Sequence, residues 1–274
     1  MLTEEYPNYS SFLLGQSPWE DADESFFEDI FFDDTPPAFS FTPDPSGLPR
    51  LLAQETPDTI TLFEGDLAGY SDGIWTLGGD DVVFASFESE RILLNQGNDT
   101  VYGGGGDDEV FGGQQDDRIF GEDGNDFLRG DRDGDIIEGG EGDDRLFGGK
   151  GNDQLFGNDG EDILSGDLGI DSLTGGGDRD IFILRTDEAS FEINEVDVIT
   201  DFDWFESGDQ IALTDGLTEA DIDYTRLTDY EGDGVANDTL ITLRTTDEIL
   251  GVVLNADDFA LFGQFVSVDP LALV

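Results

Sequence analysis

Acidic and apolar side chains recur along the middle of this chain with a strict period of nine residues. Counted from Leu67, thirteen consecutive nonapeptides carry an acidic residue at the sixth position and an apolar residue at the eighth. Neighbouring side chains of a strand point to opposite faces, so the pattern predicts one short strand per nonapeptide, with the eighth residue turned inward. The sixth-position residues are Asp72, Asp81, Glu90, Asp99, Asp108, Asp117, Asp126, Asp135, Asp144, Asp153, Asp162, Asp171 and Asp180. The eighth-position residues are Ile74, Val83, Ile92, Val101, Val110, Ile119, Leu128, Ile137, Leu146, Leu155, Leu164, Leu173 and Phe182.

The nonapeptide 148–156 illustrates the expected unit. Its first six residues are predicted to form a turn and its last three a strand, with Leu155 inward and Gln154 and Phe156 outward. The first position is glycine in every unit from Gly103 to Gly175, and this glycine is expected to permit a tight turn. A repeat this short and regular predicts a solenoid with a thin apolar core.

Composition divides the chain into three predicted segments. Residues 1–57 form an acidic arm rich in proline and phenylalanine, for which a flexible leader is favoured over an arm that docks on a neighbouring molecule. Residues 58–183 contain a first strand and turn at 58–66, followed from residue 67 by the thirteen nonapeptides. Residues 184–274 return to strand patterns at 196–202, 210–213, 239–243 and 249–254, and are predicted to form a β-rich cap on the stacked repeats.

The charge balance narrows the classes of partner. A net charge of −55, from 66 acidic and 11 basic residues, opposes compaction unless a cation binds. It disfavours nucleic acid and anionic membranes as partners, and no apolar run is long enough to span a bilayer. The chain contains no histidine and no cysteine, which excludes disulfides, thiolate sites and histidine-dependent catalysis.

The acidic turns have the chemistry of a calcium site. Aspartates that recur in glycine-rich turns offer carboxylate and main-chain oxygens, and calcium takes six to eight oxygen ligands. Magnesium prefers a smaller and more regular shell, and softer metals prefer the histidine or cysteine that this chain lacks. The alternative is a solvated acidic face on an ordinary β-solenoid, and the strictness of the acidic column favours calcium.

The units resemble the G-G-x-G-x-D-x-U-x repeat of the RTX (repeats-in-toxin, hemolysin-type) family. The resemblance implies an all-β fold, a parallel β-roll in which two nonapeptides complete one coil and several Ca²⁺ ions lie between stacked turns. The array departs from this pattern at Glu90, at Gln115 and Asp133 in the fourth position, and at Ile170 and Arg179 in the fifth. Carried over by position, the implied calcium-binding carboxylates are Asp81, Asp99, Asp108, Asp117, Asp126, Asp135, Asp144, Asp153, Asp162, Asp171 and Asp180.

Segments outside the nonapeptides add further expectations. Residues 197–202 followed by 208–211 resemble the strand-and-turn unit that caps many RTX rolls. Residues 229–234 have the alternating acids and the glycine of an EF-hand loop, but Leu240 stands where the glutamate belongs, so an isolated calcium loop and a plain acidic turn are equal alternatives. The start at 1–6 lacks the features of a cleaved signal. The family resemblance implies type I secretion through a C-terminal signal, with which 265–274 is compatible.

These features favour a secreted, extracellular or cell-surface protein without enzymatic activity. No H-E-x-x-H motif is present and Lys150 is the only lysine, which disfavours RTX proteases and acylated RTX toxins. Calcium outside the cell is expected to fold the roll. Self-assembly into a surface layer, fibre or matrix is expected, and the alternative is a monomeric adhesin or carrier that binds a ligand such as cell-surface glycans.

Two groups of aromatic side chains are candidates for self-association. The first belongs to the N-terminal arm, and the second occupies the ninth position of the repeats, where packing along the same sheet is the alternative. The arm residues are Phe26, Phe27, Phe31 and Phe32, and the ninth-position residues are Tyr102, Phe111, Phe120, Phe147 and Phe156.

Overall fold

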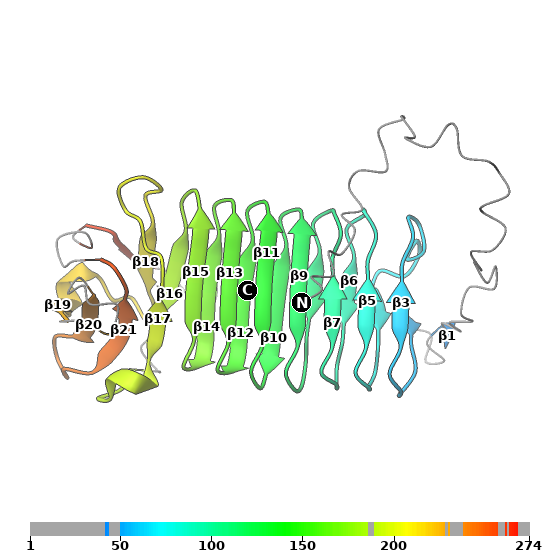
Figure 1. The fold of residues 1–274 in the computed structure, drawn as a ribbon, viewed down its shortest axis with the longest axis horizontal. Helices are drawn as coiled ribbons and strands as arrows, with labels where there is room; N and C mark the ends of the chain where they lie inside the picture. The colour runs from blue at the N-terminus through cyan, green and yellow to red at the C-terminus, as the bar shows by residue number, and fades with distance from the viewer. Residues whose placement is uncertain are drawn as a thin grey trace, which may run out of the picture. The chain divides into compact units, whose positions relative to one another are not determined.

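Parallel strands stacked into a solenoid make up most of the described chain (Figure 1). The computed structural model describes residues 42–43, 50–185, 189–227, 230, 238–256, 261 and 263–267. Strands of successive coils pair at an interval of eighteen residues, as Leu128 does with Leu146 and Leu146 with Leu164. Two nonapeptides therefore complete one coil, which confirms the predicted parallel β-roll. Within these described ranges, no helix has the length and apolar character needed to cross a membrane.

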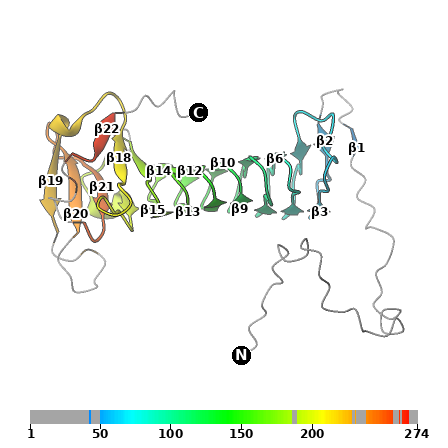
Figure 2. The same cartoon turned by 90° about the horizontal axis from the view of Figure 1, so that it is seen from above.

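Alternate strands form two eleven-stranded sheets on opposite sides of the coils (Figure 2). Two short 3-10 helices, η4 (Ile193–Glu195) and η5 (Glu219–Asp221), lie in the C-terminal part. Sheet A contains, in spatial order, β1 (Thr42–Pro43), β2 (Leu51–Leu52), β4 (Ile74–Trp75), β6 (Arg91–Leu93), β8 (Glu109–Phe111), β10 (Phe127–Arg132), β12 (Arg145–Gly151), β14 (Ile163–Gly169), β16 (Ile181–Leu184), β18 (Gln210–Leu213) and β22 (Phe265–Ser267). Sheet B contains β19 (Ile222–Arg226), β20 (Thr239–Leu243), β21 (Ile249–Val253), β17 (Asp197–Ile199), β15 (Ser172–Gly177), β13 (Gln154–Asp159), β11 (Ile136–Glu141), β9 (Arg118–Asp123), β7 (Thr100–Tyr102), β5 (Val82–Phe84) and β3 (Thr59–Thr61).

The eighth-position side chains fill the space between the sheets. All thirteen, from Ile74 to Phe182, have no exposed surface, and Ile60 of the predicted first strand joins them. Leu155 points inward as predicted, while Gln154 is exposed. Each buried aliphatic side chain contributes about 1.5–3 kcal/mol, so these side chains hold neighbouring coils together but leave little reserve for burying charge.

Strands in the second half of the array are longer than predicted. The turn expected over the first six residues of 148–156 is wrong, because residues 148–151 continue β12 and only Asn152 and Asp153 separate it from β13. The parallel pairing extends past the first-position glycine, with Gly149 beside Asp131 on one side and Asp167 on the other.

The two sheets continue beyond the nonapeptides. β17 and β18 pair in parallel with β15 and β16, and β22 pairs with β18. β19, β20 and β21 form an antiparallel meander that joins sheet B through β17, around a small apolar centre of Val196, Ile249 and Val252. The strands predicted near 196–202, 210–213, 239–243 and 249–254 are confirmed. The segment boundaries after residues 57 and 183 stay predictions.

Candidate metal centre

All eleven aspartates singled out from the sequence are buried, with at most 2% of their surface exposed. Glu90 is also buried, at 6% exposed, whereas Asp72 at the start of the array is only half-buried. Eighteen-residue spacing places them in two columns. One column contains Asp81, Asp99, Asp117, Asp135, Asp153 and Asp171, and the other contains Glu90, Asp108, Asp126, Asp144, Asp162 and Asp180.

One oxygen of each aspartate is satisfied by the main chain of the preceding coil. The amide of Asp117 donates to Asp135 Oδ1, and the amide of Asp135 donates to Asp153 Oδ1, both at 2.7 Å. The same bond recurs along both columns at 2.7–3.0 Å. A hydrogen bond to a charged acceptor contributes about 1.5–3 kcal/mol, so each aspartate links two coils.

The other carboxylate oxygen has no hydrogen-bond partner. This holds for the Oδ2 atom of all eleven aspartates and for Oε2 of Glu90, each of which is buried. An unpaired buried polar atom normally costs about 1–3 kcal/mol, and more when it carries charge. Twelve such atoms in two rows indicate that the carboxylates are arranged for a partner other than a protein hydrogen-bond donor.

Burial makes these carboxylates hard to ionise without a cation. Loss of solvent raises the pKa of Asp135, from an ordinary value of 3.8, to about 8, against the opposing effect of the hydrogen bond with Asp117. Neighbouring carboxylates raise it further. The same causes raise the pKa to about 8 for Asp108, Asp117, Asp144 and Asp180, to about 7 for Asp99 and Asp153, and to about 6 for Asp81, Asp126, Asp162 and Asp171.

The first-position glycines make room for the unpaired oxygens. A Cβ atom added to any glycine from Gly103 to Gly175 at this position would lie 2.1–2.7 Å from Oδ2 of the aspartate in the same repeat. From Gly103 to Gly157 it would also lie 2.4–2.8 Å from the carbonyl oxygen of the glycine one coil later. These glycines do not have left-handed backbone, so the prediction that they make the tight turn is wrong. Their role is to leave space beside two converging oxygens.

Left-handed backbone occurs instead at the second and fourth positions of the repeat. The departures at Gln115 and Asp133 keep this conformation, with φ of 77° and 70°, although neither residue is glycine. The turn geometry is therefore preserved at both fourth-position departures, at a conformational cost that glycine would not have.

The oxygens present fit a hard cation held by the turns of stacked coils. At Gly130, for example, Asp135 Oδ2 and the Gly148 carbonyl oxygen approach one small region. In the part of the chain that the structure describes, no three acidic side chains gather into one metal cluster. Main-chain oxygens must therefore supply much of any ligand shell. An all-oxygen shell of carboxylate and carbonyl groups matches calcium.

The carboxylate columns extend further than the sequence analysis predicted. Asp197 and Asp209, both buried, accept the amides of Asp171 and Asp180 at 3.1 Å. At the other end, the amide of Asp58 donates to Asp81 Oδ1 at 2.7 Å. The spacing widens there from 18 residues to 26, 29 and 23. The signal that could have found these residues is the triplet of aspartate, any residue and isoleucine, which occurs at 58–60, 197–199 and 209–211.

A second ladder runs along the outside of the turns. Fifth-position side chains accept amides from the following coil, as Asn125 does from Asp143 and Asn152 from Ile170. Ile170, which departs from the repeat pattern, still donates its main-chain amide to this ladder. Arg179, the other fifth-position departure, forms an ion pair with Glu161. Glu90 departs more, because its Oε1 accepts from the Ser86 hydroxyl.

Ninth-position aromatics contact one another along their own sheets. Tyr102 stacks between Phe84 and Phe120, with ring centroids 5.1 and 5.0 Å apart, and Phe147 is buried at 4% exposed. This favours packing within the sheet. The arm phenylalanines at 26, 27, 31 and 32, the loop 229–234 apart from Tyr230, and residues 268–274 lie outside the described residues.

Comparison with known protein families agrees with the geometry of the columns. The family described as RTX calcium-binding nonapeptide repeat (4 copies) matches residues 86–119, 94–128, 120–155 and 156–185. No curated protein matches the chain. Residues 86–185 hold most of the buried aspartates and first-position glycines described above. Residues 86–185 are thus similar to the RTX calcium-binding nonapeptide repeats, and these repeats form a calcium-binding β-roll.

Proposed function

We propose that this protein is a secreted structural protein whose roll folds when it meets extracellular calcium. The observation that carries the proposal is the set of twelve buried carboxylate oxygens without a partner. In the absence of calcium, folding must either bury these charges or protonate them, and both cost free energy at neutral pH. With calcium, the metal neutralises the carboxylates and its binding free energy adds to folding.

The residues proposed to hold calcium are the eleven aspartates named from the sequence, together with main-chain carbonyls of the first-position glycines. Asp135 illustrates the different roles of the two carboxylate oxygens. Its Oδ1 fixes the side chain through the amide of Asp117, and its Oδ2 is left free beside the Gly148 carbonyl oxygen. Because each first-position glycine has no side chain, the folded roll leaves both oxygens accessible to a metal ion.

A calcium titration of the purified full chain tests this proposal. Circular dichroism should change from a disordered to a β-rich spectrum on calcium addition, and chelation should reverse the change. Magnesium at the same concentration serves as the matched control and should be much less effective, because it keeps its waters and demands a regular octahedron. Cooperative folding of the calcium-free chain at neutral pH and moderate ionic strength contradicts calcium-coupled folding.

The finer role proposed is self-assembly into a surface layer, fibre or matrix after type I secretion. Sedimentation in the same titration should then show large particles of pure protein. The second candidate is an adhesin or carrier, favoured by the exposed aromatic rings of Phe63 and Phe87, at 68% and 71%. Aromatic faces of this kind suit apolar ligands or sugar rings. A calcium-folded monomer that is retained on a glycan surface supports this second function.

A further inference from the structure

The outer face of sheet A collects an unusual share of the positive charge. Six of the eleven basic residues lie on strands β6 to β16 of this sheet or directly after them. Three carboxylates share the face, and each pairs with at least one of these cations, because Asp167 lies 4.0 Å from Arg129 in addition to its contact with Arg185. Arg91 lies 3.2 Å from Glu109, Arg129 2.6 Å from Asp131 and Arg185 3.3 Å from Asp167. The cations left over are Arg132, Arg145 and Lys150.

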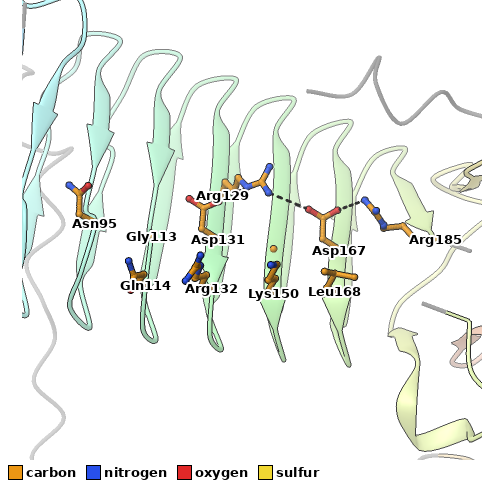
Figure 3. A pocket seen from close by; sticks show the side chains of 11 residues that line it. Asn95, Gly113, Gln114, Arg129, Asp131, Arg132, Lys150, Asp167, Leu168 and Arg185 are labelled. Atoms are coloured by element: carbon orange, nitrogen blue, oxygen red, sulfur yellow. Dashed lines mark hydrogen bonds and ion pairs between the residues drawn. The ribbon is translucent and has the colours of Figure 1, made fainter. Parts of the chain in front are cut away.

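Arg132 and Lys150 lie side by side in a shallow groove of about 500 Å³ (Figure 3). They occupy the third position of successive coils in register, and Gln114 and Leu168 continue the row. Both side chains are exposed, and among the described residues neither has an ion-pair partner. This row is therefore two free cations on the surface of a strongly acidic protein.

The outer face of sheet B has the opposite charge at the same repeat positions. Asp123, Glu141 and Asp159 occupy the third position of successive coils and pair in register, with Glu122 and Glu138 beside them. Arg118 is the single cation on strands β5 to β15, and no ion pair of these five carboxylates occurs within the described ranges. The roll thus has one cationic and one acidic side.

We infer that the cationic row of sheet A binds the acidic row of sheet B on a second copy of this chain. Both rows repeat with the strand spacing of the same solenoid, about 4.8 Å, so cations and carboxylates match in pitch. The strands of the two sheets run in opposite directions (Figure 1). The third-position rows therefore meet when the neighbouring roll is turned end for end.

Such a contact uses different surfaces on the two partners, so one molecule keeps a free acidic row and the other keeps a free cationic row. Contacts of this type extend into open arrays instead of closing into a dimer. The inference rests on the proposed self-assembly and specifies its surfaces. It also explains why calcium should come first, since bound calcium lowers the net charge that keeps the rolls apart.

Charge reversal and mixing test the contact. Variant one carries Arg132→Glu and Lys150→Glu, and variant two carries Asp123→Lys and Glu141→Lys. Each alone should need at least about tenfold more protein to assemble in saturating calcium, because like charges then face each other. Mixing the two should restore assembly, since the reversed face of each meets a complementary face of the other. A variant with Arg179→Glu and Arg244→Glu, outside both rows, controls for net charge.

Sedimentation and calcium-dependent circular dichroism separate the outcomes. A wild-type chain that folds with calcium but stays monomeric overturns self-assembly itself. A wild type that assembles, with both reversed variants assembling equally well, overturns this contact and leaves self-assembly standing. Loss in each variant without recovery on mixing also overturns the contact, because it points to an external anion or another surface. Recovery on mixing supports it.

Discussion

Replacing Gly130 by alanine tests whether the space beside the carboxylates is needed for calcium binding. The added Cβ would lie 2.1 Å from Asp135 Oδ2 and 2.7 Å from the Gly148 carbonyl oxygen. Neither distance is compatible with non-bonded contact, so the Asp135 carboxylate must rotate away. Overpacking costs about 1–3 kcal/mol, and loss of the hydrogen bond from the Asp117 amide costs about another 1.5–3 kcal/mol. The total expected loss is about 2.5–6 kcal/mol.

Gly177→Ala is the matched control, because its added Cβ would lie 3.7 Å from its nearest neighbours and its backbone is not left-handed. The assay is the calcium midpoint of folding by circular dichroism, followed by urea unfolding in saturating calcium. Gly130→Ala should move the midpoint to higher calcium and lower the free energy of unfolding, while Gly177→Ala changes both little. Equal midpoints for the two variants would refute the reasoning that the glycine keeps the oxygens accessible.

Three further perturbations address the turns, the core and the carboxylates. Gln115→Gly should raise the free energy of unfolding in calcium by about 1 kcal/mol, because glycine adopts the left-handed backbone of this position without strain. Gln154→Gly in β13 should lower the free energy of unfolding by a similar amount. Urea midpoints of the two variants that move in the same direction would contradict this prediction. Leu146→Ala should lower the free energy of unfolding by about 2–5 kcal/mol, because Leu146 is fully buried. Leu168 is 40% exposed, so Leu168→Ala should lower it by less than about 0.5 kcal/mol. Equal losses in the two variants would show that the eighth-position side chains do not form the core. In chelator, acidification should stabilise the fold, because buried carboxyls with pKa raised from 3.8 to about 6–8 take up protons on folding. The stability contributed by these protons is fully present below pH 3.8 and is lost as pH rises through about 6 to 8. If circular dichroism in chelator shows no gain of β-structure between pH 8 and pH 4, this prediction is wrong.

The repeat period was sufficient to predict a solenoid and its apolar core, whereas the coil of two nonapeptides and the calcium-binding role of the aspartates were implied by the family resemblance. Strict spacing works here because every coil meets an equivalent neighbour, so Leu128, Leu146 and Leu164 share one environment. The same reasoning missed Asp197 and Asp209, since inserted loops change the spacing while the hydrogen-bonded column continues.

Other features depend on three-dimensional neighbours that no period reveals. The first-position glycines resemble turn residues in the sequence, yet their backbone is not left-handed. They matter because the missing side chain leaves space for a carboxylate oxygen of Asp135 or of the equivalent aspartate in another repeat. The charge difference between the sheets was also hidden. Arg132 and Glu141 are only nine residues apart, and only the winding of the coil places them on opposite sides.

Because one eighteen-residue coil contains two nonapeptides, the sheet on which a strand lies depends on whether an even or an odd number of repeats precedes it. Removing one complete coil, such as residues 121–138, would leave every later strand on its original sheet. Removing nine residues would instead transfer every later strand to the other sheet, and Lys150 would change sides with Glu141. The carboxylate columns are equivalent and would tolerate either change, but the outer faces would not. The length of such a roll can therefore vary freely only in even numbers of repeats if its two sides have different partners.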